Sequence, residues 1–189
     1  MRKLVVIPTY NEIENMKVLL PELLALPESF DVLVVDDSSP DMTAKFVEEF
    51  SKKNSRIHLL LRKTKNGLGQ AYIAGFKWGI ENKYDSLIEM DADFSHRPQD
   101  LLKILEALKT NDVVVGSRYT IGGSTVNWGI LRKIISKGGS LYSRLILGYP
   151  VKDWTGGFNG WNTQVLKDIN LDLIRSNGYS FQIELKYKA

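Results

Sequence analysis

Two carboxylates separated by one small residue, Asp91 and Asp93, follow the apolar run that ends at Met90. Carboxylates this close repel each other unless a cation lies between them, and a hard divalent cation such as Mg2+ or Mn2+ accepts such oxygen ligands. In an extended chain, residues two apart point to the same side, so Ser95 offers a third oxygen. The alternative is a structural turn that caps a helix near Pro98. We favour a metal site formed by Asp91, Asp93 and Ser95.

The charge pattern reverses downstream of this pair. Between Gly116 and Lys152 the sequence has no Asp or Glu, while its basic residues are Arg118, Arg132, Lys133, Lys137, Arg144 and Lys152. An acidic pair followed by a basic stretch suits a site that holds a divalent cation, a diphosphate and a second anion together. A guanidinium grips phosphate oxygens in a fork, so Arg118 is a phosphate-binding candidate and Arg132 a second one. The alternatives are an Arg118 paired with a nearby acid and a solvated basic helix face.

The bulk composition excludes several classes of protein. The chain has 189 residues, enough for one domain with a core, and its net charge of +3 is too small to indicate a nucleic-acid partner. It has no cysteine, which excludes disulfides and thiolate metal sites. The apolar N-terminal run ends at Pro8, and no run approaches the roughly 20 residues of a spanning helix. We therefore expect a cytoplasmic chain without signal peptide or transmembrane helix, which can still lie on a membrane surface.

Short apolar runs alternate with helical periodicity, and this alternation predicts an α/β fold with a mostly parallel central sheet flanked by helices. Strands are predicted at Lys3–Thr9, Val32–Val35, Ile57–Leu61, Ser86–Met90 and Val113–Gly116. Helices are predicted at Glu12–Leu26, Thr43–Phe50, Gly69–Glu81, Gln99–Leu108, Leu131–Leu147 and Phe181–Ala189. Thr120–Gly129 is predicted as a loop, and Val151–Trp161 as a loop that leads into a short strand.

Polar residues follow the predicted strands where the carboxyl ends of a parallel sheet share one edge, the edge at which open α/β sheets bind ligands. After the second strand, we expect Asp37 to accept hydrogen bonds from a nucleobase or ribose and Asp36 to be structural, although both could simply form a turn. Asn66–Gly69 matches neither a Walker loop nor a dinucleotide fingerprint. It predicts a tight turn and helix start, or a supporting contact to a diphosphate.

Several motifs, in this order, resemble those of family 2 glycosyltransferases with the GT-A fold, most closely the dolichyl-phosphate and polyprenyl-phosphate mannosyltransferases. The matching segments are Val6–Glu12, Val34–Asp41, Met90–His96, Gly116–Tyr119, Asp153–Phe158 and Gly178–Glu184. The resemblance implies an inverting transfer of mannose from GDP-mannose to a polyprenyl (dolichyl) phosphate at the cytosolic face of a membrane. It also implies one GT-A domain over residues 1–189, with a nucleotide-sugar half to about 117 and an acceptor half from about 118.

The resemblance also assigns roles by position. Pro8, Tyr10, Glu12, Val35 and Asp37 would hold the nucleoside, and Ala92 would also touch the nucleotide. Asp91 and Asp93, with Ser95, would hold Mg2+ or Mn2+ on the diphosphate, while Arg118 would contact phosphate and Arg132 the acceptor phosphate. Family members continue past the last predicted helix into a strand and a basic segment, so we expect this chain to be truncated.

The implied chemistry needs no general base, because a phosphate acceptor is already ionised near neutral pH. Catalysis then reduces to alignment and to neutralisation of the leaving nucleotide by metal and arginine. The basic stretch and the helix at Leu131–Leu147 are expected to face the lipid phosphate and an anionic membrane surface. Two alternatives remain: a transferase that uses a UDP-sugar such as UDP-glucose, or a soluble acceptor, and a non-catalytic nucleotide- or partner-binding module.

Overall fold

The computed structural model describes residues 1–120 and 130–189, apart from the side chains of residues 130–137 and 179. Most of the predicted loop Thr120–Gly129 lies outside these residues. The strands are β1 (Lys3–Thr9), β2 (Asp31–Asp36), β3 (Ile57–Leu61), β4 (Ser86–Glu89), β5 (Val113–Val115) and β6 (Asn159–Asn162). The helices are α1 (Ile13–Leu24), α2 (Thr43–Ser51), α3 (Leu68–Glu81), α4 (Pro98–Ala107), α5 (Ile130–Leu147), α6 (Thr163–Ile169), the 3-10 helix η1 (Leu171–Leu173) and α7 (Tyr179–Lys188).

The strands form one sheet in the order β3-β2-β1-β4-β6-β5. β1 pairs in parallel with both β2 and β4, and β2 with β3. β6 runs antiparallel to its two neighbours, β4 and β5, so β5 points the same way as β1 to β4 without touching them. The predicted α/β fold with a mostly parallel sheet is confirmed, and the carboxyl ends of β1 and β4 lie side by side near its centre.

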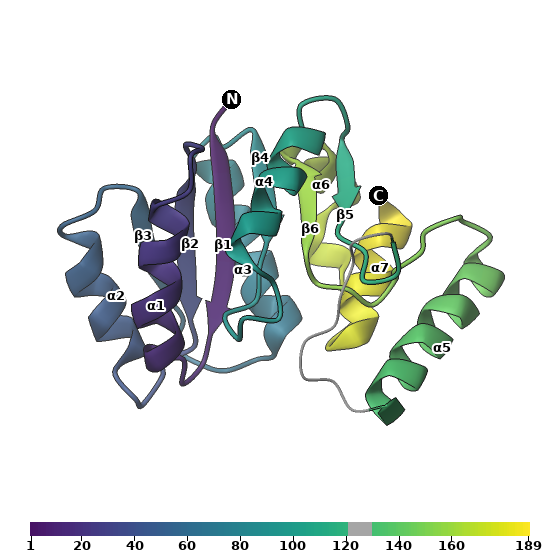
Figure 1. Ribbon diagram of the computed structural model, residues 1–189, viewed down its shortest axis with the longest axis horizontal. Coiled ribbons are helices and arrows are strands. Elements are labelled where there is room, and N and C mark those ends of the chain that lie inside the picture. Colours follow the sequence, from purple (N-terminus) through teal and green to yellow (C-terminus); the bar gives the residue numbers. More distant parts are fainter. Residues whose placement is uncertain (121–129) are drawn as a thin grey trace.

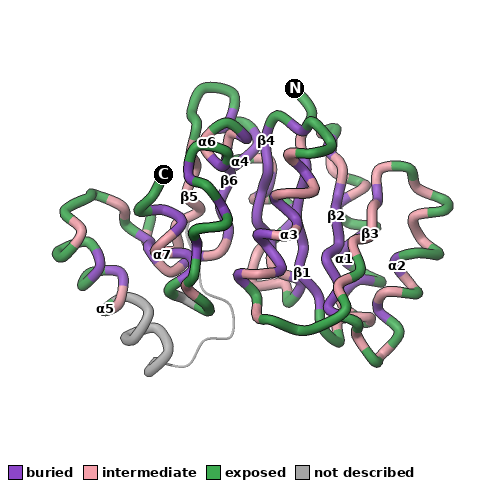
Figure 2. Tube along the Cα trace, turned by 180° about the vertical axis from the view of Figure 1, so that it is seen from behind, coloured by how far each residue is buried: buried purple, intermediate pink, exposed green. Residues whose placement is uncertain are grey.

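Helices cover both faces of this sheet (Figure 1). α1, α2 and α4 pack on one face and α3, α6 and α7 on the other, each set closing its own hydrophobic cluster. In β1, Val5 and Ile7 belong to the first cluster, whereas Leu4 and Val6 belong to the second. Because both faces of a parallel sheet are buried, its strands are continuous apolar runs rather than alternating ones. Figure 2 shows the central strands buried along nearly their whole length.

Two short elements, α6 and η1, were not predicted. The N-cap of α6 is Asn162, whose side chain accepts a hydrogen bond of 3.0 Å from the backbone N–H of Gln164. An Asn in this position is a typical N-cap, and this signal in the sequence could have located the helix. The short strand into which the predicted loop Val151–Trp161 leads is present as β6, which begins at Asn159.

The packing of α3 against the sheet requires a glycine at position 75. A Cβ atom there would lie 2.4 Å from Cγ1 of Val6 and 3.1 Å from Cγ2 of Val35. Overpacking of this kind typically costs about 1–3 kcal/mol, against a gain of about 1 kcal/mol in helix propensity. We expect Gly75→Ala to lower the free energy of unfolding in a urea titration. Gly138→Ala in α5, where no atom lies within 4 Å of the added Cβ, should raise it, and equal gains would contradict the close packing of α3.

Candidate active site

A cleft of about 420 Å³ opens at the carboxyl ends of β1, β2 and β4, where the order of strands places ligand sites in open α/β sheets. The cleft is closed on its other side by α3, by the segment before β6 and by the start of α7. Seven of the residues singled out by the sequence line it together: Pro8, Tyr10, Glu12, Asp37, Asp91, Ala92 and Asp93.

Three other candidates are not among the residues that line the cleft, and a fourth is outside the described side chains. Val35 is fully buried in β2, and neither Ser95 nor Arg118 is among the residues that line the cleft. The side chain of Arg132 lies outside the described part of α5. From the predicted turn Asn66–Gly69, two residues line the cleft. They are Gly67 and Leu68, at the start of α3.

The Asp91 carboxylate is oriented by a buried tyrosine. The Tyr72 hydroxyl, from α3, donates a hydrogen bond of 2.8 Å to Oδ1 of Asp91. Burial, followed by the negative charge of Asp91, raises the pKa of Tyr72 well above its ordinary value, so the hydroxyl stays protonated as a donor. His96 accepts a 3.0 Å hydrogen bond from the Asp91 backbone N–H and stacks on Phe158 with ring centroids 4.8 Å apart. His96 thus holds the backbone of the loop in place.

Asp93 is exposed in the cleft and ionised. Burial would raise the pKa of Asp93, but hydrogen bonds from Ser95 outweigh it, so the pKa lies below its ordinary value. The Ser95 N–H donates to Oδ1 of Asp93 over 2.9 Å. β4 ends at Glu89, and Phe94 has a left-handed φ of 59°, so residues 91–95 form a bend. The expected extended geometry is therefore wrong: the bend turns both carboxylates to the cleft while Ser95 binds Asp93.

These carboxylates fit a divalent cation that shares its other ligands with a substrate. Among the residues that the structure describes, no group of three or more His, Cys, Asp or Glu side chains could enclose a metal ion. Mg2+ and related ions retain water and are often held by one or two carboxylates together with substrate phosphates. Asp91 and Asp93 supply that number of carboxylates on one cleft wall.

The two aspartates after β2 have different environments. Asp36 is fully buried and accepts hydrogen bonds from the Thr9 hydroxyl (2.8 Å) and from the Ser39 N–H (2.8 Å) and hydroxyl (2.6 Å). Asp37 lines the cleft, and its Oδ1 lies 2.9 Å from Nη1 of Arg62. Burial raises the pKa of Asp37, an effect that the Arg62 charge opposes. Asp36 therefore ties the ends of β1 and β2 together, as expected, and Asp37 is the one that faces the cleft.

One cation in the cleft was missed by the sequence analysis. Nζ of Lys65, in the loop before α3, lies 3.7 Å from the centroid of the Tyr10 ring, at a cation–π distance. Of the described residues that line the cleft, Lys65 alone has a basic side chain. Nothing in the sequence distinguishes it from its neighbour Lys63; only the packing of this loop over Tyr10 does.

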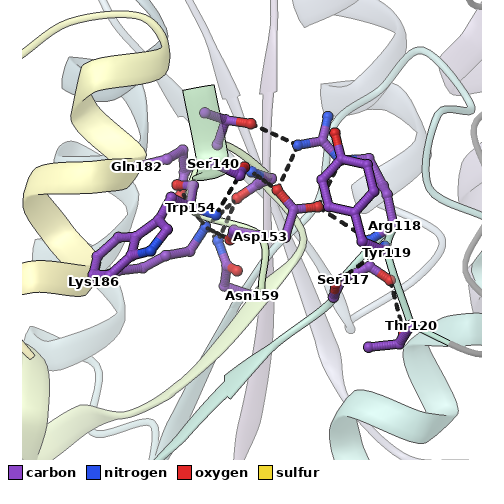
Figure 3. Close-up of polar contacts among 12 residues, drawn as sticks. Ser117, Arg118, Tyr119, Thr120, Ser140, Asp153, Trp154, Asn159, Gln182 and Lys186 are labelled. Atoms are coloured by element: carbon purple, nitrogen blue, oxygen red, sulfur yellow. Dashed lines mark hydrogen bonds and ion pairs between the residues drawn. The ribbon is translucent and has the colours of Figure 1, made fainter. Parts of the chain in front are cut away.

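Arg118 does not line the cleft but contacts Thr155, a residue that does. Its guanidinium donates to both carboxylate oxygens of Asp153, over 2.7 and 2.6 Å, and to the Thr155 hydroxyl over 2.7 Å (Figure 3). Thr155 itself lines the cleft. This is the pairing with a nearby acid that the alternative interpretation of Arg118 expected, and it leaves the guanidinium at the cleft's edge.

Sequence comparison assigns the chain to a family. The sequence model for glycosyl transferase family 2 matches residues 4–169. An undecaprenyl-phosphate mannosyltransferase from Micrococcus luteus is 50% identical over 190 residues, covering 100% of this chain and 78% of that protein. A polyprenol monophosphomannose synthase from Mycolicibacterium smegmatis is 42% identical, with 100% and 72% covered. A dolichol-phosphate mannosyltransferase from Pyrococcus furiosus is 36% identical, and this chain spans 53% of its length.

Solved structures share the fold at low sequence identity. Glucosyl-3-phosphoglycerate synthase from Mycobacterium tuberculosis, crystallised with Mn2+, UDP and phosphoglyceric acid, superposes with a TM-score of 0.69 at 18% identity over 98% of this chain and 62% of that one. A mannosyltransferase from Pyrobaculum calidifontis with GDP-Man and Mn2+ gives 0.60 at 16% identity, covering 89% of this chain and 46% of that one. The chain spans less than two thirds of either structure. It belongs to glycosyl transferase family 2, whose GT-A-like fold it has.

If Tyr72 orients a metal-binding carboxylate, Tyr72→Phe should weaken Mn2+ binding in the presence of GDP. Partners that orient a metal ligand typically contribute about 10–100-fold in affinity, and we expect a loss in this range by calorimetric titration. Tyr84→Phe is the matched control, because the Tyr84 hydroxyl donates to Asp31, an aspartate outside the cleft lining. Equal Mn2+ affinity in both variants and in the unmodified protein would refute this role of Tyr72.

Proposed function

We propose that this protein transfers mannose from GDP-mannose to a polyprenyl phosphate at the cytosolic face of a membrane, with inversion at the sugar carbon. The observation that carries the proposal is the cleft in which Asp91 and Asp93 meet the residues that follow β1 and β2. The 50% identity to an undecaprenyl-phosphate mannosyltransferase over the whole chain supports the sugar and the acceptor. Residues 1–117 would form the nucleotide-sugar half of one GT-A domain, and residues 118–189 the acceptor half.

The nucleoside would bind where Pro8, Tyr10, Glu12 and Asp37 line the cleft, with Val35 in the buried strand behind them. The Asp37 carboxylate can accept hydrogen bonds from base N–H groups, and the Lys65 ammonium can donate to a base carbonyl. Guanine presents two adjacent N–H donors next to a carbonyl, whereas uracil presents one N–H. A carboxylate beside an ammonium therefore favours GDP over UDP.

The diphosphate would lie over Ala92 with Mg2+ or Mn2+ held by Asp91 and Asp93. When bound, the ion would neutralise the charge that develops on the departing nucleotide. Ser95 supports this arrangement through its hydrogen bond to Asp93. Arg118 and Arg132 would add positive charge for the donor and acceptor phosphates, and the already ionised acceptor would need no general base.

The outer face of α5 supports a membrane-surface role. Leu141, Tyr142, Leu145 and Ile146 are 57%, 68%, 73% and 66% exposed, while Ser140 and Ser143 face inward and are buried. α5 lies at one end of the molecule, beyond α7 (Figures 1 and 2). A helix that turns its apolar side outward beside an acid-free basic stretch suits the boundary of an anionic membrane. In the part of the chain that is described, no helix has the length and apolarity needed to cross a membrane.

The donor assignment can be tested by transfer and competition. With Mn2+ and undecaprenyl or dolichyl phosphate, GDP-mannose should give a mannosyl phospholipid. GDP should displace a labelled nucleotide at least about tenfold better than UDP, as expected from one extra paired group worth about 1–3 kcal/mol. Asp37→Asn should lower the ratio of GDP to UDP affinity, whereas Asp100→Asn, at a half-buried residue of α4 outside the cleft lining, should not.

Two results would favour the alternatives. Displacement by UDP as good as by GDP, with glucose transferred from UDP-glucose, would support the UDP-sugar transferase. A nucleotide affinity that responds neither to Mn2+ nor to Asp93→Ala would support the non-catalytic binding module.

Membrane contact should depend on the apolar side of α5. We expect Leu141→Glu/Leu145→Glu to reduce binding to vesicles that contain anionic lipid by at least about tenfold, since each buried leucine contributes roughly 1.5–3 kcal/mol. The control, Leu61→Glu/Leu173→Glu, adds the same charge at two other exposed leucines. Sedimentation with vesicles measures both. Equal loss in the two variants would show that added charge, and not this face, governs binding.

A further inference from the structure

Two buried ionisable residues have no role in the proposed function. Glu89, in β4, is fully buried, and Lys186, in α7, is 7% exposed. Lysine is seldom buried unless its ammonium is paired. The contacts of these two residues therefore indicate which part of the structure they hold in place.

Lys186 holds the backbone of one irregular segment. Its Nζ donates to the carbonyl oxygens of Asp153 (3.1 Å), Trp154 (3.1 Å) and Gly156 (2.7 Å), which uses all three donors of an ammonium (Figure 3). These carbonyls lie between α5 and β6, in a stretch without helix or strand. Buried carbonyls outside regular structure need such a partner.

The same segment is fixed from its other side. The Asp153 carboxylate receives two hydrogen bonds from the Arg118 guanidinium and one of 2.9 Å from the Gly156 N–H. Burial would raise the pKa of Asp153, but Arg118 outweighs it and holds that pKa below its ordinary value. Residues 153–157, called the clamped segment below, are thus held between Arg118 and Lys186. Two of its members, Thr155 and Gly157, line the cleft.

Glu89 supplies the compensating charge. Its carboxylate accepts hydrogen bonds from Asn159 (2.9 Å) and Gln182 (2.8 Å), and burial, opposed by these bonds and by the charge of Lys186, raises its pKa. Gln182 lies one turn before Lys186 on α7 and lines the cleft. A buried pair of charges is often no more stabilising than an apolar pair of the same volume. Stability alone is therefore a weak explanation for the burial of these two charges. The fixing of three carbonyls beside the cleft is a more specific explanation.

We propose that Lys186 is a positioning residue for glycosyl transfer, which fixes the clamped segment so that Thr155 and the Arg118–Asp153 pair stand beside Asp91. This inference rests on the proposed function. The added Cβ of a residue at Gly157 would lie 3.6 Å from Asp91 Oδ2, which shows how closely the clamped segment approaches that carboxylate. The nucleoside end of the cleft, around Asp37, is built by other elements. Loosening the segment should therefore affect transfer more than nucleotide binding.

The test separates positioning from burial of charge. Lys186→Met alone leaves Glu89 buried without its partner and should lower the melting temperature. Glu89→Gln/Lys186→Met removes both charges together and should recover the part of that loss that comes from the uncompensated charge, while the three carbonyls remain without their donor. Lys188→Met is the control: Lys188 lies on the same helix, half-exposed, and pairs with Glu184.

In the double variant we expect kcat to fall by about 10–100-fold, the range that a misplacement of about 1 Å can produce, with the dissociation constant of GDP changed by less than about twofold. Amide hydrogen exchange of residues 153–157 should accelerate. The control, Lys188→Met, should change neither kcat nor this exchange. A double variant with unaltered kcat and exchange overturns the inference. Equal losses in kcat and GDP affinity also overturn it, because they indicate a general collapse of the site. If the unmodified protein transfers no mannose, the proposed function fails, while amide exchange still tests whether Lys186 holds the segment.

Discussion

Repulsion among carboxylates at one edge of the sheet is the constraint on which the site depends. Glu12, Asp37, Asp91 and Asp93 line one cleft, and of the described residues there only Lys65 is basic. Asp37 is paired with Arg62, but Asp91 and Asp93 are oriented by neutral donors, the Tyr72 hydroxyl and the Ser95 amide, which fix these two carboxylates without neutralising them. Charge left uncompensated by the fold is available to a ligand. A divalent cation that arrives with a diphosphate meets that requirement, because it brings positive charge to the acids and carries its own anion.

The sheet explains why these acids come together and why the sequence could reveal them. Parallel strands end at the same edge, so residues that follow β1, β2 and β4 lie close together. This proximity can be predicted from the alternation of strands and helices, without knowledge of any long-range contact. That rule pointed to Asp37, Asp91 and Asp93 from the chain alone, whereas Pro8, Tyr10, Glu12 and Ala92 were assigned through the family resemblance. It could not place Ser95, because the bend at Phe94 breaks the extended geometry on which its prediction relied.

The residues that sequence reasoning missed are those whose position depends on packing between distant segments. Tyr72 is separated from Asp91 by a helix and a strand, and Gln182 reaches the cleft only because α7 folds back over β4 and β6. In the sequence, Lys186 looks like any lysine of a polar C-terminal helix, and its burial appears only once three carbonyls converge on it. For Arg118 the sequence left two interpretations open, phosphate binding and pairing with a nearby acid. The structure shows the pair with Asp153 and places it next to Thr155, a cleft residue. The two interpretations are therefore compatible in space.

The clamped segment also links the cleft to α5. The Ser140 hydroxyl accepts a hydrogen bond of 3.3 Å from the Trp154 N–H, and a Cβ on Gly139 would lie 3.9 Å from the Thr155 methyl group. The inner side of α5 therefore rests on the segment that Lys186 and Arg118 hold, while its outer side presents leucines and a tyrosine to the surroundings. If the outer side meets a lipid surface, the same short segment is in contact with the membrane-facing helix and with the wall beside Asp91. Under the proposed function, a polyprenyl phosphate would bring its headgroup from the membrane to that wall, and the clamped segment between the two would keep this distance constant from one turnover to the next.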